Sequence, residues 1–270
     1  MTSTTSPAEP VLSMTGISKR FGAVQALQDV QFDVHAGEVV ALVGDNGAGK
    51  STLIKAIAGV YTPDEGEVVF LGNKVTITSP SEAQRLGIAT VFQDLALCDN
   101  LDVVGNLFLG SEVVTGGALD EVTMEQESWR LLRELSAKMP SVRIAVASLS
   151  GGQRQTVAIA RSLLGKPKLV MLDEPTAALG VAQTAEVLNL IERLRENGLA
   201  VILISHNMSD VMAVADRVVV LRLGRNNGEF LVSETSNQEI VAAITGATTN
   251  VVTQRAARRT AAALGEEEAS

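Results

Sequence analysis

The chain has few aromatic residues, which make up 3% of its 270 positions, so aliphatic side chains must fill its core. Its single cysteine, Cys98, excludes an internal disulfide and fits a reducing compartment. No apolar run reaches the roughly 18–20 residues of a membrane-spanning helix, and residues 1–10 lack the basic and apolar regions of a signal peptide. A net charge of −9 disfavours nonspecific binding to nucleic acid. We therefore expect an acidic protein that reaches a membrane, if at all, through a partner.

The sequence contains one glycine-rich stretch with a known pattern. Residues 44–51 read GDNGAGKS and fit the phosphate-binding pattern G-x-x-x-x-G-K-[ST]. An apolar run (38–43) precedes it and a helical pattern (52–58) follows it, as such a loop requires. The glycines let backbone N–H groups surround a phosphate. Lys50 adds a charge for the β- and γ-phosphates, and the Ser51 hydroxyl is placed to ligate Mg²⁺. The sequence thus predicts a nucleotide held by Gly44, Asp45, Asn46, Gly47, Ala48, Gly49, Lys50, Ser51 and Thr52.

Short apolar runs at 38–43, 88–92, 169–172 and 201–204 alternate with helical patterns. This alternation predicts an α/β fold with a parallel sheet that is covered by helices on both faces. Ligands of such sheets bind at the carboxyl ends of the strands. The polar residues expected at that edge are Gly44, Gln93, Asp173 with Glu174, and His206.

The chemistry of these side chains suits a hydrolytic site. Asp173 ends an apolar strand and can hold Mg²⁺ together with Ser51 and the amide of Gln93. Glu174 can orient or deprotonate an attacking water, and His206 can contact the γ-phosphate or position the glutamate. Taken alone, two acids after a strand are as often a helix N-cap signal, and a lone histidine is usually structural. The phosphate loop makes the catalytic interpretation the stronger one.

Two further regions flank this core. Residues 11–34 and 67–77 alternate as antiparallel strands do, which predicts a small antiparallel β subdomain. The pattern from about 94 to 160 is helical and indicates a helical insert. The expected organisation is a disordered leader (1–10), one catalytic domain (11–246) and a flexible tail (247–270).

The most specific motif is residues 149–153, which read LSGGQ. Here the sequence resembles the ATP-binding-cassette (ABC) ATPases, whose signature is LSGGQ. The resemblance covers roughly residues 11–245, and the motifs come in the family's order: GDNGAGKS, Gln93, LSGGQ, the apolar strand that leads into Asp173 and Glu174, and His206. It implies an ABC ATPase domain with the P-loop NTPase fold, a RecA-like parallel sheet, ATP and Mg²⁺ as cofactors, and hydrolysis of ATP.

The resemblance also assigns roles beyond the phosphate loop. Residues 150–152 open the helix that begins near Gln153 and would form a second anion site. In the family two subunits pair head to tail, and this site of one copy closes over the γ-phosphate that the other holds. Gly180 stands where the family usually has an aspartate that couples the two sites, so hydrolysis is expected while the carboxylate used for that coupling is missing. The implied additional nucleotide contacts are Phe21, for which core packing is the alternative, and Ser150, Gly151, Gly152 and Gln153.

The sequence around the motifs is most similar to that of the ATP-binding subunits of bacterial monosaccharide importers. The similarity is to importers of the fructose or xylose type, which have one cassette per chain. The stretches are VALVGDNGAGKSTLIK, VFQDLALCDNLDVVGNLFLG and EPTAALGVAQTAEV, with ISHNM after them. This implies a second copy of the chain and a membrane permease as partners, and an extracytoplasmic sugar-binding protein as an indirect one. The chain would be cytoplasmic, bound to the inner face of the membrane through the permease. The permease would dock near Asp99–Asn106.

Two alternatives have different sequence signatures. A cassette ATPase that acts on ribosomes or DNA usually has two cassettes, long coiled insertions or basic arms, and the chain has none of these. A P-loop kinase or GTPase would leave LSGGQ and His206 unexplained, and no NKxD-type base-recognition motif is present. The importer interpretation is therefore favoured.

Overall fold

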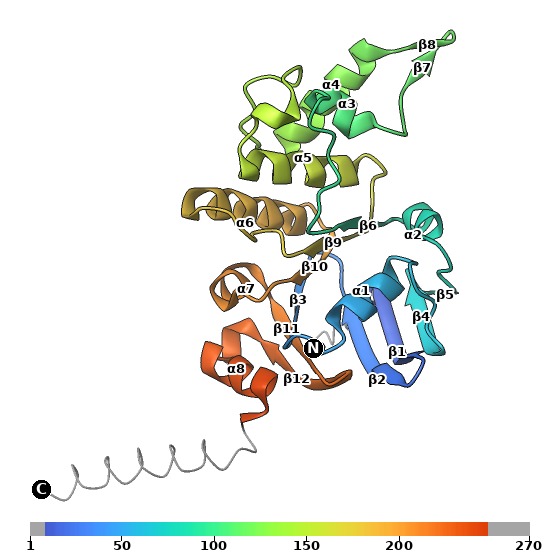
Figure 1. The fold of residues 1–270 in the computed structure, drawn as a ribbon, viewed down its shortest axis with the longest axis vertical. Helices are drawn as coiled ribbons and strands as arrows, with labels where there is room; N and C mark the ends of the chain where they lie inside the picture. Colours follow the sequence, from blue (N-terminus) through green and yellow to red (C-terminus); the bar gives the residue numbers. More distant parts are fainter. Residues whose placement is uncertain (1–8, 248–270) are drawn as a thin grey trace, which may run out of the picture.

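A computed structural model describes residues 9–247 of the chain. The predicted leader (1–10) and tail (247–270) lie almost wholly outside these residues. The central feature is a six-stranded sheet (Figure 1) in which five strands run parallel and β12 pairs antiparallel with β11. Its strands in spatial order are β12 (Arg225–Leu231), β11 (Arg217–Arg222), β3 (Val39–Val43), β10 (Ala200–Ile204), β9 (Leu169–Asp173) and β6 (Ile88–Val91).

The central strands are apolar on both sides because both faces of the sheet are covered. In β3 the side chains of Val39, Ala41 and Val43 enter one core, while those of Val40 and Leu42 enter a second core across the sheet. The same alternation holds in β9, β10 and β11. Continuous Val, Ile and Leu runs are typical of parallel strands in this environment.

Helices fill the first core, and two helices with a smaller sheet fill the second. The first core is covered by α3 (Val103–Phe108), α4 (Glu121–Glu134), α5 (Gly151–Leu163), α6 (Val181–Glu196), α7 (Met208–Val214) and α8 (Asn237–Thr245). The second core is covered by α1 (Lys50–Ile57), α2 (Pro80–Leu86) and an antiparallel sheet in the order β2 (Val24–Val34), β1 (Leu12–Phe21), β4 (Glu65–Phe70) and β5 (Asn73–Val75). Among residues 9–247, no helix combines the length and apolar character needed to cross a bilayer.

Three local features differ from the sequence-based expectations. Strand β12 was not predicted, because its side chains are mostly exposed and polar; it is held partly by Asn226, whose side chain exchanges two 2.8 Å hydrogen bonds with the backbone of Gln31 in β2. The insert is not wholly helical, since a hairpin, β7 (Val114–Thr115) and β8 (Ala118–Leu119), turns at the two glycines between its strands. Helix α5 begins at Gly151, two residues before the expected start at Gln153, because Ser150 caps it.

Candidate functional site

The phosphate loop connects β3 to α1 with backbone conformations that favour glycine. Gly44 and Gly49 have φ angles of +152° and +105°. A side chain at Gly44 would lie 2.2 Å from the carbonyl oxygen of Leu221, and one at Gly49 would lie 2.8 Å from that of Ala26. Helix α1 then begins at Lys50, with no side chain capping its first N–H groups. These groups point from the positive end of the helix dipole and suit a phosphate.

The Lys50 side chain folds back over this loop. Its Nζ donates hydrogen bonds to the carbonyl oxygens of Gly44, at 2.6 Å, and Asp45, at 3.1 Å. Burial lowers the pKa of Lys50, and the nearby negative charges of Glu174, Asp45 and Asp173 oppose that shift. Three acids from two segments thus act on one ammonium group, so the phosphate loop and the end of β9 lie near each other.

The end of β9 supplies two carboxylates in different environments. Burial, followed by the charge of Glu174, raises the pKa of the Asp173 carboxyl. Glu174 adopts φ +50°, outside the usual range for its residue type. Its Oε2 lies 2.8 Å from Nδ1 of His206 and accepts the His206 backbone N–H at 3.4 Å. The Glu174 side chain is 16% exposed and that of His206 is 76% exposed, so the histidine holds the glutamate from the solvent side.

Sheet order explains why these segments meet. Strands β3, β10, β9 and β6 are consecutive neighbours and run parallel. Gly44, His206 and Asp173 therefore lie at one carboxyl edge of the sheet. Gln93 follows β6 at the end of the same edge, where its side chain is exposed. The predicted gathering of these segments is confirmed, and the roles of the individual side chains stay predictions.

Phe21 lies at the end of β1, in the smaller antiparallel sheet. The residue is 40% exposed, so core packing does not explain it. The ring meets that of Tyr61 edge to face, with centroids 5.0 Å apart, and Lys55 of α1 lies 5.8 Å from the centre of the Tyr61 ring. Phe21 and Tyr61 thus form an aromatic pair beside α1. Tyr61 was not predicted as a site residue, because it stands in a turn whose sequence signals only a change of direction.

The LSGGQ segment lies on the opposite side of the six-stranded sheet from α1. The buried side chains of α5 belong to the first core and those of α1 to the second. Ser150 Oγ accepts the N–H of Gln153 at 3.3 Å, and Gln153 Oε1 accepts the N–H of Ser150 at 3.0 Å. A side chain at Gly151 would lie 2.8 Å from Leu179, so this glycine lets α5 pack against the turn before α6. The structure therefore does not bring Ser150 together with Lys50 within one chain.

A buried contact that sequence reasoning missed fixes the turn after Glu174. The hydroxyl of Thr176 donates a 2.6 Å hydrogen bond to Asp210, which is 6% exposed at the start of α7. The two residues are 34 positions apart. The local sequence does not predict that these two residues are in contact, because each one alone resembles an ordinary helix-start signal.

The segment expected to dock a partner is partly buried. Asn106 is fully buried and its amide bonds to the backbone of Cys98, Leu101 and Asp102. It therefore cannot touch a partner, and the expectation for the whole of Asp99–Asn106 is corrected at this residue. Its role is to hold the loop that follows Gln93 against α3.

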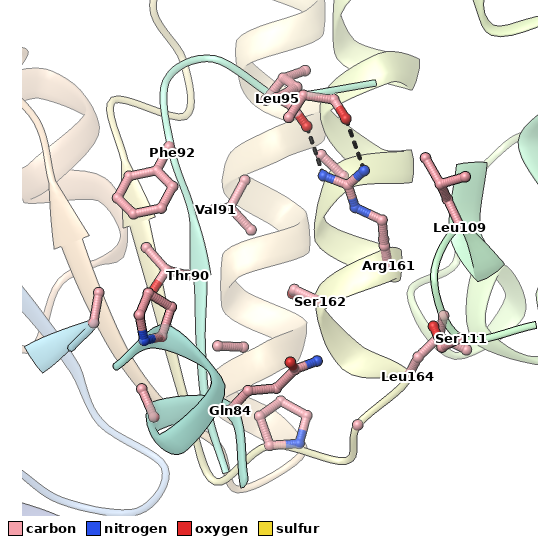
Figure 2. A pocket seen from close by; sticks show the side chains of 18 of the residues that line it. Gln84, Thr90, Val91, Phe92, Leu95, Leu109, Ser111, Arg161, Ser162 and Leu164 are labelled. Carbon is pink, nitrogen blue, oxygen red and sulfur yellow. Dashed lines mark hydrogen bonds between the residues drawn. The ribbon is translucent and has the colours of Figure 1, made fainter. Parts of the chain in front are cut away.

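A groove of about 580 Å³ lies next to this loop. It runs between α2, strand β6, α3 and α5, and Figure 2 shows the side chains that line it. We call it the β6 groove. Its apolar lining includes Phe92, Leu109 and Val60, which are 40%, 47% and 45% exposed. Large apolar side chains that gather on a surface mark a docking site for another protein.

Comparison with known proteins agrees with this geometry. The ABC transporter family model matches residues 27–177. The chain is 45% identical to the xylose/arabinose import ATP-binding protein XylG of Sulfolobus acidocaldarius, over 87% of this chain and 94% of that protein. It is also 45% identical to the fructose import ATP-binding protein FrcA of Rhizobium meliloti, over 88% and 95%. The ribose import ATP-binding protein RbsA of Caldanaerobacter subterraneus is 41% identical, but the match spans only 48% of that protein.

Solved structures resemble the fold closely. A nucleotide-free ATP-binding cassette from an ABC transporter aligns with a TM-score of 0.74 at 27% identity, covering 88% of this chain and 96% of that one. A dimeric ATP-binding cassette in a post-hydrolysis state, bound to ADP and phosphate, aligns with a TM-score of 0.67 at 25% identity, covering 82% and 98%. The predicted fold class, a P-loop NTPase with a parallel sheet core, is confirmed.

Proposed function

This chain belongs to the ABC transporter family, and we propose that it is the ATP-hydrolysing subunit that powers import of a monosaccharide through a membrane permease. The predicted family and its ATPase class are confirmed. One observation carries the proposal: the phosphate loop, the two acids of β9 and His206 meet at one edge, as hydrolysis of a nucleoside triphosphate requires. The imported sugar class comes from the names of the relatives, which are sugar import proteins.

In this proposal different groups of the chain have different roles in ATP hydrolysis. Backbone N–H groups at the start of α1, together with Lys50, bind the phosphates. The Glu174 carboxylate, held by His206, orients the attacking water and takes its proton. Phe21 offers an exposed aromatic face for the adenine base. Gln93 follows β6 at the same edge, where its amide would help to hold the metal and orient the water.

The residues also fit Mg²⁺ that enters with the nucleotide. Within residues 9–247, no cluster of three or more His, Cys, Asp or Glu side chains could hold a metal by itself. The phosphate oxygens would complete the set offered by the Ser51 hydroxyl, Asp173 and Gln93. A divalent cation would also compensate the partly buried carboxyl of Asp173, whose pKa is raised by burial. When bound, the metal neutralises phosphate charge.

Two copies of the chain would form each complete site. Ser150 and Lys50 lie on opposite faces of the sheet, so one copy cannot easily close both anion sites on one nucleotide. A head-to-tail dimer solves this problem, because the start of α5 in one copy then covers the phosphates held by the other. This arrangement also accounts for the exposed Ser150.

Complementation between two inactive variants tests the shared site. Lys50→Ala and Ser150→Phe should each abolish turnover. Mixed in equal amounts, they should recover about a quarter of the wild-type rate, because half of the dimers are mixed and each has one intact site. Phosphate release measures the recovery. If the mixture stays inactive while both variants fold and the Ser150→Phe chain binds ATP, the two anion sites do not come from different copies.

The β6 groove is the proposed docking surface for a cytoplasmic segment of the permease. It adjoins Gln93 and therefore connects the partner to the hydrolytic edge. Indirect interaction with an extracytoplasmic sugar-binding protein, and attachment to the inner face of the membrane, follow from this contact. Co-purification of the chain with its permease, followed by transport of a panel of pentoses and hexoses in proteoliposomes, tests the function. ATP hydrolysis without sugar uptake for any member of the panel would contradict it.

A further inference from the structure

Arg161 stands out among the side chains of the β6 groove. It extends from α5, and its guanidinium donates to the carbonyl oxygens of Leu95, at 2.8 Å, and Ala96, at 2.9 Å. Figure 2 shows the Arg161 side chain between Phe92 and Leu109. The group is half-buried, and burial lowers its pKa.

Arg161 differs in its partners from Arg154, Arg195 and Arg217, although Arg193, which is also partly buried, likewise bonds to a neutral group, the Ser136 hydroxyl. Arg154, Arg195 and Arg217 each form an ion pair with a carboxylate. For Arg161, the part of the chain that the structure describes supplies two carbonyl oxygens and no carboxylate within ion-pair distance. A guanidinium has five N–H donors, so these two bonds leave part of its binding capacity open to the groove. Partly buried charges are normally compensated by an opposite charge.

We propose that the segment that occupies the β6 groove brings an Asp or Glu carboxylate to Arg161, with apolar side chains beside it that cover Phe92 and Leu109. The inference rests on the proposed function, because the occupant is a cytoplasmic segment of the permease. Charge complementarity selects a carboxylate: among residues 9–247, the only other charged side chain lining the groove is Asp94. The Asp94 carboxylate already accepts the N–H of Ala96, at 3.1 Å, and would repel a second acid anywhere but at Arg161.

The contact would have a mechanical consequence. Arg161 lies on the helix that begins at Ser150, and its bonds reach the loop that follows Gln93. A carboxylate that binds Arg161 therefore pulls on the LSGGQ helix and on the Gln93 loop together. The partner would in this way act through one side chain on both the LSGGQ segment and the Gln93 loop, which contribute to different nucleotide sites of the proposed dimer.

The test measures binding of the full chain to purified permease in nanodiscs, at low and high salt. Arg161→Gln should weaken binding about tenfold, since it leaves the partner carboxylate without its counter-charge. Arg161→Glu should weaken it further. Each acid in the cytoplasmic loops of the permease is then changed to lysine, and one of these changes should restore binding to Arg161→Glu while it weakens binding to the wild type.

Two controls separate charge recognition from a merely structural role of Arg161. Leu109→Glu and Leu109→Gln both remove an apolar contact, but only the glutamate competes for Arg161, so it should weaken permease binding several-fold more than the glutamine. Arg130→Gln, on α4, removes an arginine that already pairs with Glu127 and Glu134 and should leave binding unchanged.

The outcomes distinguish the two levels of the proposal. If the wild-type chain does not bind the permease, the proposed function fails, and this inference with it. If the wild type binds but Arg161→Glu binds equally well, or no permease acid restores its binding, the inference alone is overturned. A change in self-association of the Arg161 variants with no change in permease binding would make the groove a contact between copies, which also overturns it.

Discussion

The edge of the six-stranded sheet where the parallel strands begin (the amino edge) and the edge where they end (the carboxyl edge) differ in how their charged side chains are paired. At the amino edge, Arg217 is 7% exposed and bonds to the carboxylates of Glu38, Asp33 and Glu229. At the carboxyl edge, Lys50 bonds to backbone carbonyl oxygens of its own loop and, within the described part of the chain, to no carboxylate. The first set of charges is satisfied within the fold, so it stabilises the fold. The second keeps binding capacity for a ligand, and that capacity marks the functional edge.

The pKa directions follow the same division. At the amino edge, burial raises the pKa of Glu38, but hydrogen bonds from Arg217 and His35 outweigh this and lower it overall. At the carboxyl edge, burial raises the pKa of Asp173 and its neighbour Glu174 raises it further. A carboxylate at the amino edge is thus stabilised in its charged form by the protein itself, whereas burial and the charge of Glu174 disfavour the charged form of Asp173.

The largest expected effect is on turnover, at the carboxyl edge. Glu174→Gln should lower the rate of ATP hydrolysis about 10²–10⁴-fold, because it removes the base while keeping the shape of the side chain. ATP should still bind, and the dimer should persist with ATP bound. Phosphate release and size-exclusion chromatography measure these effects. The matched amide change at the amino edge, Glu229→Gln, should leave turnover per folded molecule unaltered; equal losses in both variants would erase the distinction between the edges.

The next effect is on stability, at the amino edge. Arg217→Met should lower the free energy of unfolding by about 2–3 kcal/mol, somewhat less than the ~3–5 kcal/mol for a fully buried ion pair, because the partner carboxylates are partly exposed. Urea unfolding measures it. Arg130→Met, which breaks exposed pairs on α4, should cost less than about 1 kcal/mol. Arg217 with Asp33, Glu38 and Glu229 is called the Arg217 cluster. Comparable losses of unfolding free energy in the two variants would mean that this cluster does not stabilise the fold more than an exposed ion pair.

The amino edge should also give stability a dependence on pH. Because the pKa of folded Glu38 lies below its ordinary value of 4.5, its charged form stabilises the fold above that value, and the contribution is lost as the pH falls through the folded pKa. Wild type should therefore melt at a higher temperature than Glu38→Gln at pH 7, and the gap should close in acid. A gap that stays constant from neutral pH to pH 3 would contradict this account.

The smallest effect concerns Gly180, at the start of α6. Its φ is −75°, and a side chain there would meet nothing within 4 Å. Gly180→Asp should therefore stabilise the chain by a few tenths of a kcal/mol, because aspartate caps a helix somewhat better than glycine. Thermal melting measures this, and the dependence of turnover on ATP concentration shows whether the added carboxylate couples the two sites. A lower melting temperature would reveal a steric constraint at this turn.

The sequence predicted the parts of this comparison that local patterns encode. The apolar runs of β3, β9 and β10 are buried on both faces, so their positions and the polar residues at their ends could be read directly. Strand β12 could not, since it is an exposed edge strand whose support comes from Asn226 and a strand almost 200 residues earlier. The Arg217 cluster and the groove around Arg161 were missed for the same reason, because both join segments that are distant in the chain.

The bare beginning of α1 has a thermodynamic consequence. A nucleotide that binds there would complete the hydrogen bonding of the first turn, so the ligand would serve as the missing cap of the helix. Binding free energy then adds directly to the resistance of the fold to heat, growing with the logarithm of ligand concentration. A melting curve could therefore rank nucleotides by how well each one finishes the helix, without any chemistry taking place.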